Sequence, residues 1–278
     1  MQYLIGGMSL KQSFVAWVMQ HKSLLRPGHR AIEWPFFLGH IPLLRDIHPW
    51  MDRRKSTITY LPINETLRSQ SIPMPAEVIA AYIQQSPYHV IMNRCLCRTA
   101  RDCQDHPHNI GCLFMGESAL QMPPQISRRV DVPEALRHLE KALDAGLVPL
   151  VGKVRFDNFA FLIPDEKKLL SVCFCCSCCC MMAYYRHLPP DKLDTVFPRL
   201  EGLTIEVTDD CQGCGTCAQN CFVKAITMEN GKAVHSATCR GCGRCARFCP
   251  NQAVRITLTK PDYQEDVLRR INDRVDFK

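Results

Sequence analysis

Apolar residues recur at helical spacing in three parts of the chain. Residues 9–25 predict an amphipathic helix that is capped by Ser9 and stopped by Pro27-Gly28. A second helix is expected from about Pro75 to Gln85, with a proline in its first turn. A third is expected over about 133–145, before a glycine that suits a helix end.

Shorter apolar runs predict strands in the middle of the chain. These runs are Tyr88–Met92, 147–154, Phe159–Ile163 and Leu169–Cys173. Beyond the first helix, the chain up to about residue 73 is broken by prolines and is expected to be irregular. Helices and strands follow one another after that point, which indicates a mixed α/β region.

The C-terminal part of the chain contains a repeat, in which Cys211 and Cys239 begin matching runs 28 residues apart. The runs read Cys211-x2-Cys214-x2-Cys217-x3-Cys221 and Cys239-x2-Cys242-x2-Cys245-x3-Cys249-Pro250. Such a duplication indicates two stacked structural units. A charged helix over about 262–275 follows, and its narrow apolar stripe predicts a packing seam.

The spacing of these cysteines resembles the bacterial two-cluster ferredoxins over about residues 203–258. In that family, the first three cysteines of each run hold one [4Fe-4S] cluster and the fourth crosses to the other cluster. The resemblance implies one cluster held by Cys211, Cys214, Cys217 and Cys249, and a second held by Cys239, Cys242, Cys245 and Cys221. Phe222 stands where the family usually has proline, whereas Pro250 keeps it, so the crossing of Cys221 is the less secure of the two.

The loops between these cysteines are rich in glycine. Gly213, Gly215, Gly241 and Gly243 are expected to let backbone N–H groups turn toward the cluster. Paired C-x2-C thiols also build zinc ribbons, which is the alternative interpretation. Three thiols at this spacing followed by a fourth, found twice, suit a cubane better.

Ten of the 18 cysteines lie in the middle of the chain. Cys95, Cys97, Cys103 and Cys112 are enough for one further cubane. Six more are Cys173, Cys175, Cys176, Cys178, Cys179 and Cys180, of which Cys173, Cys176 and Cys179 repeat the ferredoxin spacing while Cys175 and Cys178 interleave. Because four cubanes need only about sixteen thiolates, either two cysteines are idle or the ten hold clusters with five thiolates each.

The second option resembles the non-cubane sites of the heterodisulfide reductase family, although Ser177 follows the Cys175-Cys176 pair where that family has glycine. Residues 90–260 also resemble poorly characterised cysteine-rich iron–sulfur proteins of anaerobes, in which a C-x-C-Arg segment precedes a Cys-Cys-rich segment and a ferredoxin end. Both resemblances imply redox chemistry with one or two additional clusters. His106 and His108 are further candidate ligands, and Arg98 and Arg101 are candidate counter-charges.

The formal charge of +7 counts every cysteine as a neutral thiol. Four cubanes of about −2 each would bring the protein near neutrality, so no nucleic-acid partner is expected. Basic residues gather within residues 1–60, and this region is expected either to dock an acidic partner or an anionic membrane surface or to form a solvated basic face.

The apolar runs are too short for a membrane span, and many free thiols suit a reducing compartment. A cytoplasmic, anaerobic location is expected, with contact to the inner face of the membrane as an option.

These patterns together predict a mixed α+β and α/β fold. The expected parts are a basic irregular and helical region over 1–73, a cysteine-rich α/β iron–sulfur domain over 74–187, a linker over 188–202, a two-cluster ferredoxin domain over 203–258 and a C-terminal helix over 259–278.

The expected function is electron transfer through several clusters, between a redox partner protein or larger oxidoreductase complex and a redox enzyme or central cluster. The alternative is a redox enzyme subunit in which an unusual central cluster reduces or activates a substrate. A zinc-dependent nucleic-acid binder fits the basic N-terminus but not the duplicated motif. No phosphate loop, dinucleotide fingerprint or Ser-His-Asp set is evident, so catalytic residues stay unassigned.

Overall fold

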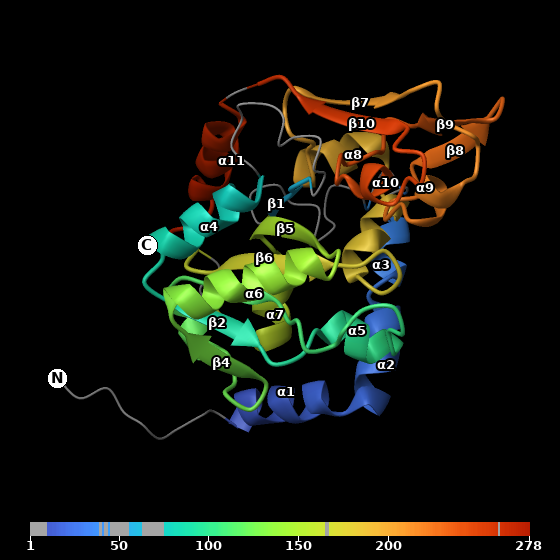
Figure 1. Ribbon diagram of the computed structural model, residues 1–278. Helices are drawn as coiled ribbons and strands as arrows, with labels where there is room; N and C mark the ends of the chain where they lie inside the picture. Colours follow the sequence, from blue (N-terminus) through green and yellow to red (C-terminus); the bar gives the residue numbers. More distant parts are fainter. Residues whose placement is uncertain are drawn as a thin grey trace.

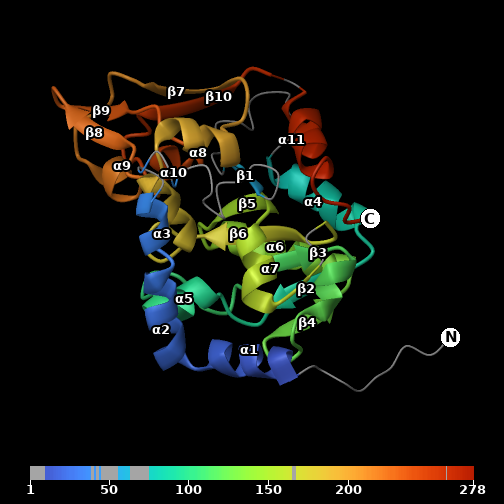
Figure 2. The same ribbon diagram turned by 180° about the vertical axis from the view of Figure 1, so that it is seen from behind.

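The computed structural model describes residues 10–38, 41, 44, 56–62, 75–164, 167–260 and 262–278 (Figure 1). A sheet with helices on both faces occupies the middle of the molecule, and the C-terminal repeat lies at one end of it (Figures 1 and 2). The cap expected at Ser9 and the basic residues between 45 and 55 lie outside the described residues.

The central sheet has six strands in the order β1-β5-β6-β3-β2-β4, and every neighbouring pair is antiparallel. The strands are β1 Thr57–Tyr60, β2 His89–Met92, β3 Leu113–Met115, β4 Ser127–Val130, β5 Val148–Lys153 and β6 Leu170–Cys175. Among the described residues the middle of the chain is therefore α+β, without the parallel strand pairs that an α/β region contains.

Helices and short helical turns surround this sheet. Those that precede or cover it are α1 Leu10–Gln20, α2 Lys22–Ala31, α3 Trp34–Phe37, α4 Pro75–Gln85, α5 Leu96–Arg101, η3 Glu117–Gln121, α6 Val132–Asp144 and α7 Arg155–Phe161. Those that follow it are η4 Met181–His187, α8 Pro190–Val196, α9 Thr216–Gln219, α10 Arg244–Arg247 and α11 Tyr263–Asn272. The predictions for α4, α6, β2 and β5 agree with these bounds to within one or two residues, and β6 ends two residues beyond its prediction.

Successive side chains of the central strands enter two different cores. Ile91 of β2 and Leu113 of β3 pack with α4, α6 and α11, whereas Val90 and Phe114 pack with α1 and α7. This alternation follows the pleat of the strands. Figures 1 and 2 show α6 and α7 on opposite faces of the sheet. Because both faces are covered, the inner strands β2, β3, β5 and β6 are largely apolar, whereas the edge strand β4 carries exposed Arg128 and Arg129.

The N-terminal helix differs from the single helix expected over 9–25. α1 stops before His21, and α2 continues through Pro27-Gly28, which was expected to end the helix. His21 has an extended backbone (φ −96°, ψ 102°), and its ring Nδ1 lies 2.6 Å from the Trp17 carbonyl oxygen. α2 tolerates its internal proline because it packs along α5, and tertiary packing outweighs local propensity.

Two other segments were wrongly predicted. Phe159–Ile163, expected to be a strand, lies in α7 and its end, where Leu162 has a left-handed φ of 54°. Residues Thr57–Tyr60, expected to be irregular, form β1, which pairs with β5. The boundary expected at 73/74 is therefore not a boundary of the sheet. Short apolar runs do not by themselves distinguish strand from helix.

The segment expected to be a linker, 188–202, is packed into the protein instead. Pro189 and Pro190 begin α8, because proline is well suited to a first helical turn. Leu193, Val196 and Phe197 are buried in one core with side chains of β1, β5 and the repeat. The repeat and the central sheet therefore share a hydrophobic interior.

The repeat folds as two similar halves. β7 Leu203–Val207 pairs with β10 Val254–Leu258, and β8 Ile226–Glu229 pairs with β9 Lys232–His235. In each cysteine run the third cysteine lies in a one-turn helix, α9 Thr216–Gln219 or α10 Arg244–Arg247, and the fourth cysteine follows that helix. β7 and β10 also contribute to the core of α4 and α11, where Val267, Ile271 and Val275 are buried. The stripe on α11 is thus a packing seam, as the sequence predicts.

Candidate metal centres

Four central thiols form a compact group. The Sγ atoms of Cys103, Cys176, Cys178 and Cys179 all lie within 4.8 Å of one another. Cys103 follows α5, and the other three lie in the turn after β6. The fold thus joins two segments that are far apart in the sequence.

The electrostatics of this group favour a thiolate at Cys176. The thiols of Cys178 and Cys179 hydrogen-bond to its sulfur and hold the pKa of Cys176 well below its ordinary value, and Arg98 adds to this effect. The pKa of Cys178 is raised in turn, chiefly by the same hydrogen bond. Thiolates are the form that binds metals, so the group fits a thiophilic metal centre.

Arg98 supplies buried positive charge beside these thiols. Its guanidinium donates to the carbonyl oxygens of Phe174, at 2.9 Å, and Ile110. Burial alone lowers the pKa of Arg98, but the nearby sulfurs of Cys95 and Cys176 outweigh burial and raise it. Arg98 therefore suits the counter-charge role that the sequence indicated.

The other candidate side chains have different partners. Arg101 donates to the Tyr184 hydroxyl at 2.6 Å, and Tyr184 in turn contacts His29 at 2.8 Å, so Arg101 ties α5 to α2 and η4. The ring of His108 lies 2.9 Å from the Cys103 carbonyl oxygen. His106 and His108 are not part of the compact thiol group.

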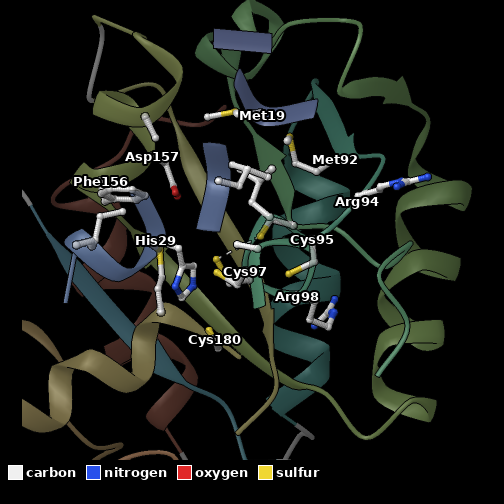
Figure 3. Close-up of a pocket in the computed structure, with 18 of the residues that line it drawn as sticks. Met19, His29, Met92, Arg94, Cys95, Cys97, Arg98, Phe156, Asp157 and Cys180 are labelled. Carbon is white, nitrogen blue, oxygen red and sulfur yellow. Dashed lines mark hydrogen bonds between the residues drawn. The ribbon is translucent and has the colours of Figure 1, made fainter. Parts of the chain in front are cut away.

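The remaining six central thiols lie together on the other side of β6. Cys112 and Cys173 are 3.6 Å apart, and Cys175 and Cys180 are 3.1 Å apart. Cys97 hydrogen-bonds to both Cys95 and Cys180. Five of the six line a cavity with Cys176, and Figure 3 shows Cys95, Cys97 and Cys180 there.

These two groups are not the sets that the spacing suggested. Cys103 lies with the thiols of the turn after β6 and not in one group with Cys95, Cys97 and Cys112. Cys173 likewise separates from Cys176 and Cys179, because it lies within β6 while they lie in the turn that follows. Strand geometry, and not the x2 spacing, decides which way each thiol faces.

The eight cysteines of the repeat line two small cavities. One is lined by Cys211, Cys214, Cys217 and Cys249, and the other by Cys221, Cys239, Cys242 and Cys245. These are the same two sets that the ferredoxin resemblance implies. Each set offers four thiols, the number that a cubane needs.

Backbone N–H groups point at several of these sulfurs in matching ways. Ala225 donates to Cys221 and Ala253 donates to Cys249, both at 3.3 Å. Gly241, with φ at 67°, donates to Cys239 at 3.4 Å, and its counterpart Gly213 has φ at 66°. The turn favours glycine at 241 because other residues rarely adopt this positive φ, and a Cβ there would also meet the end of the Leu203 side chain at 2.8 Å.

Three large side chains between the central thiols and the repeat were not singled out as functional from the sequence. Tyr60 is fully buried. Burial raises the pKa of its hydroxyl, and the nearby sulfurs of Cys175, Cys180 and Cys242 raise it further. Its ring stacks on Phe222 with the ring centroids 5.1 Å apart. Arg244 lies over Phe222 at 5.3 Å and donates to Ser177 at 3.3 Å.

Comparisons of the chain with protein-family models, curated proteins and solved structures find no significant match. Within the part of the chain that the structure describes, no helix is both long enough and apolar enough to cross a bilayer.

Proposed function

We propose that this protein transfers electrons through several iron–sulfur clusters. The observation that carries the proposal is the gathering of free thiols into four groups, two in the repeat and two beside β6. Cysteine thiolates in sets of four suit [4Fe-4S] clusters, which supply reversible one-electron chemistry when bound. This chain would provide the ligands and the N–H donors and exclude water.

The packing between the groups supports transfer from the repeat to the central thiols. Cys221, Cys239 and Cys245 share a hydrophobic core with Cys175 and Cys180. Tyr60, Phe222 and Arg244 fill the space between the two parts. Electrons that enter through the repeat would therefore pass to the centre without crossing solvent.

The first test is anaerobic iron and acid-labile sulfide analysis of the full-length protein. Two ferredoxin cubanes alone contain about eight irons, and each central cubane adds about four. We expect at least twelve or so irons by this reckoning. Cys103→Ser combined with Cys176→Ser should remove the metal of the compact group, about four irons where that group holds a cubane, while Ser177→Ala in the same turn should remove none. A content of zinc in place of iron would overturn the proposal.

The compact group of Cys103 also fits a single ion. Zinc–sulfur bonds of about 2.3 Å place four tetrahedral thiolates roughly 3.8 Å apart, which is compatible with the observed limit of 4.8 Å. A cubane would require the turn at 176–180 to open. Metal analysis of the double variant above distinguishes loss of one zinc from loss of iron.

A redox enzyme subunit is the second candidate function. It is favoured by the cavity beside Cys95, Cys97, Cys112 and Cys173, which is much larger than the two cavities of the repeat. An open iron or non-cubane signal from the central site would favour this function, whereas plain four-thiolate signals would favour electron transfer.

The N-terminal helices supply a candidate contact surface for a redox partner or a membrane surface. Exposed apolar side chains there are Leu10, Phe14, Trp17, Leu24, Trp34 and Phe37. Exposed Arg26 and Arg30 lie on the same helices. We propose a reducing cytoplasm as the location, because so many free thiols persist in such a compartment.

A further inference from the structure

His29 is a buried side chain of α2 that lines the cavity beside the second group of central thiols. Only 6 % of its surface is exposed, and Cys97 and Cys180 line the same cavity. In Figure 3 the ring of His29 lies beside Cys97 and above Cys180. Spacing along the sequence does not reveal this contact, because His29 lies far from the cysteine runs.

The Nδ1 atom of His29 is held by two side chains from other elements. The Nε atom of Arg101 donates to Nδ1 at 3.3 Å, and the Tyr184 hydroxyl lies 2.8 Å from the same atom. A guanidinium has donors but no acceptor, so Nδ1 is the accepting nitrogen of the ring. Burial and then Arg101 lower the pKa of His29 to about 4, which agrees with a neutral ring that keeps a single proton on Nε2.

This Nε2–H group is buried and makes no hydrogen bond with any group in the part of the chain that the structure describes. The Cys179 carbonyl oxygen partly offsets the lowered pKa of the ring, but it does not form a hydrogen bond with Nε2. Arg98 lines the same cavity, and its Nε atom is likewise buried without a partner. Because a buried N–H group without an acceptor is costly, two of them at one cavity indicate an acceptor that binds between the thiols.

We propose that the Nε2–H group of His29 donates a hydrogen bond to a sulfur atom of the iron–sulfur cluster held in this cavity. The inference rests on the proposed function, because the acceptor is that cluster. An N–H donor at a cluster sulfur stabilises the extra negative charge of the reduced state and so raises the reduction potential. His29 acts as a donor and not as a ligand, since Nδ1 accepts from Arg101 and Nε2 carries the proton.

Two substitutions of His29 separate hydrogen-bond donation from packing. His29→Phe keeps an aromatic ring against Tyr184, whose ring centroid lies 5.5 Å from that of His29, but it has no N–H group. His29→Gln places an amide N–H near the position of Nε2. His21→Phe is the matched control, because His21 is exposed at the start of the same helix and lies outside the lining of the cavity.

The test is a redox titration of the full-length, anaerobically purified protein, followed by electron paramagnetic resonance of the central cluster. We expect His29→Phe to disfavour one-electron reduction about tenfold, which is a fall in potential of about 59 mV, while its iron content stays unchanged. His29→Gln should recover most of the original potential, and His21→Phe should match the original protein.

A second measurement does not depend on any variant. Electron–nuclear double resonance of the reduced original protein, compared in water and deuterium oxide, should show an exchangeable proton coupled to the cluster. With ¹⁵N-labelled histidine, the same measurement should show a weakly coupled nitrogen. Both signals should be missing from His29→Phe.

An unchanged potential in His29→Phe, or an equal shift in His29→Phe and His29→Gln, would overturn the inference. A nitrogen coupling as strong as that of a coordinated histidine would also overturn it, as would the absence of any coupled nitrogen. Failure of the proposed function is distinct, because it appears as missing iron and sulfide in the original protein. Failure of this inference leaves the iron and sulfide content of that protein intact.

Discussion

At the residue scale, buried cations are the clearest link between the two parts of the molecule. Arg244 comes from the second run of the repeat, yet it donates to Ser177 beside the central thiols and to the Gly146 carbonyl oxygen at 3.0 Å. Burial lowers the pKa of Arg244, and the sulfurs of Cys242 and Cys176 partly offset this effect. Its positive charge therefore faces both thiol groups.

Replacing this charge should make the adjacent clusters harder to reduce. In Arg244→Met, the added electron loses a neighbouring cation, so we expect reduction potentials to fall by roughly 60 mV, equivalent to a tenfold change in the one-electron equilibrium. Redox titration followed by electron paramagnetic resonance measures this. Arg244→Lys should retain most of the potential, and Arg247→Met, exposed on the same helix, should change little. Equal shifts of the reduction potential in all three variants would contradict the proposal that the positive charge of Arg244 tunes the clusters.

A buried carboxyl makes stability depend on pH. Burial raises the pKa of Asp157 to about 7, against an ordinary value of 3.8, while the bond from Ser171 lowers it. The folded protein thus favours the protonated carboxyl. This contribution to stability is complete below about pH 4 and is lost as the pH rises through 7.

Asp157→Asn should remove that dependence. Relative to the variant, the original protein should lose about 1.6 kcal/mol of unfolding free energy between pH 5.5 and 7. Anaerobic denaturant unfolding at the two pH values measures the difference. Asp210→Asn, an exposed control, should leave the slope unchanged. If the unfolding free energy of Asp157→Asn changed with pH as much as that of the original protein, the Asp157 carboxyl would already be ionised in the folded state.

At the element scale, the sequence was sufficient where local signals and tertiary context agree. α4 and α6 have proline near their starts and apolar faces, and both occur where predicted. β1 and α7 could not be assigned, because a short apolar run becomes strand or helix according to its neighbours. β1 exists through its pairing with β5, some ninety residues away in the chain.

The two runs of the repeat lead to a specific prediction on ligand crossing. Cys249 lines the cavity of Cys211, Cys214 and Cys217, so Cys249→Ser should damage that cluster and spare the other. Cys221→Ser should have the reverse effect, because Cys221 lines the cavity of Cys239, Cys242 and Cys245. Spectroscopy of each variant, with iron content, distinguishes the two outcomes. Damage to the same cluster in both variants would refute the crossing.

At the scale of the whole molecule, the sequence predicted the grouping of the thiols in the repeat but not that of the central thiols. Residue types alone marked all ten central cysteines as candidate ligands, because so many thiols in two short segments suit metal binding. The partner of each thiol depends on how the turn after β6 meets the end of α5. The shared cores could not be predicted from the sequence either. The prolines of 188–202 indicate a linker, and only the structure shows that α8 is buried.

Because the cores are shared, loss of metal should unfold more than one part. Clusters bind the folded chain and not the unfolded one, so their removal takes binding free energy away from folding. Leu203, Ile256 and Leu258 of the repeat pack in the same core as α4 and α11. Chelation of iron from the intact protein should therefore abolish protease resistance over both 90–185 and 203–258, in one transition by circular dichroism. Loss of the repeat alone, with 90–185 still resistant, would show two independent domains and would leave the central thiols without a structural role for metal.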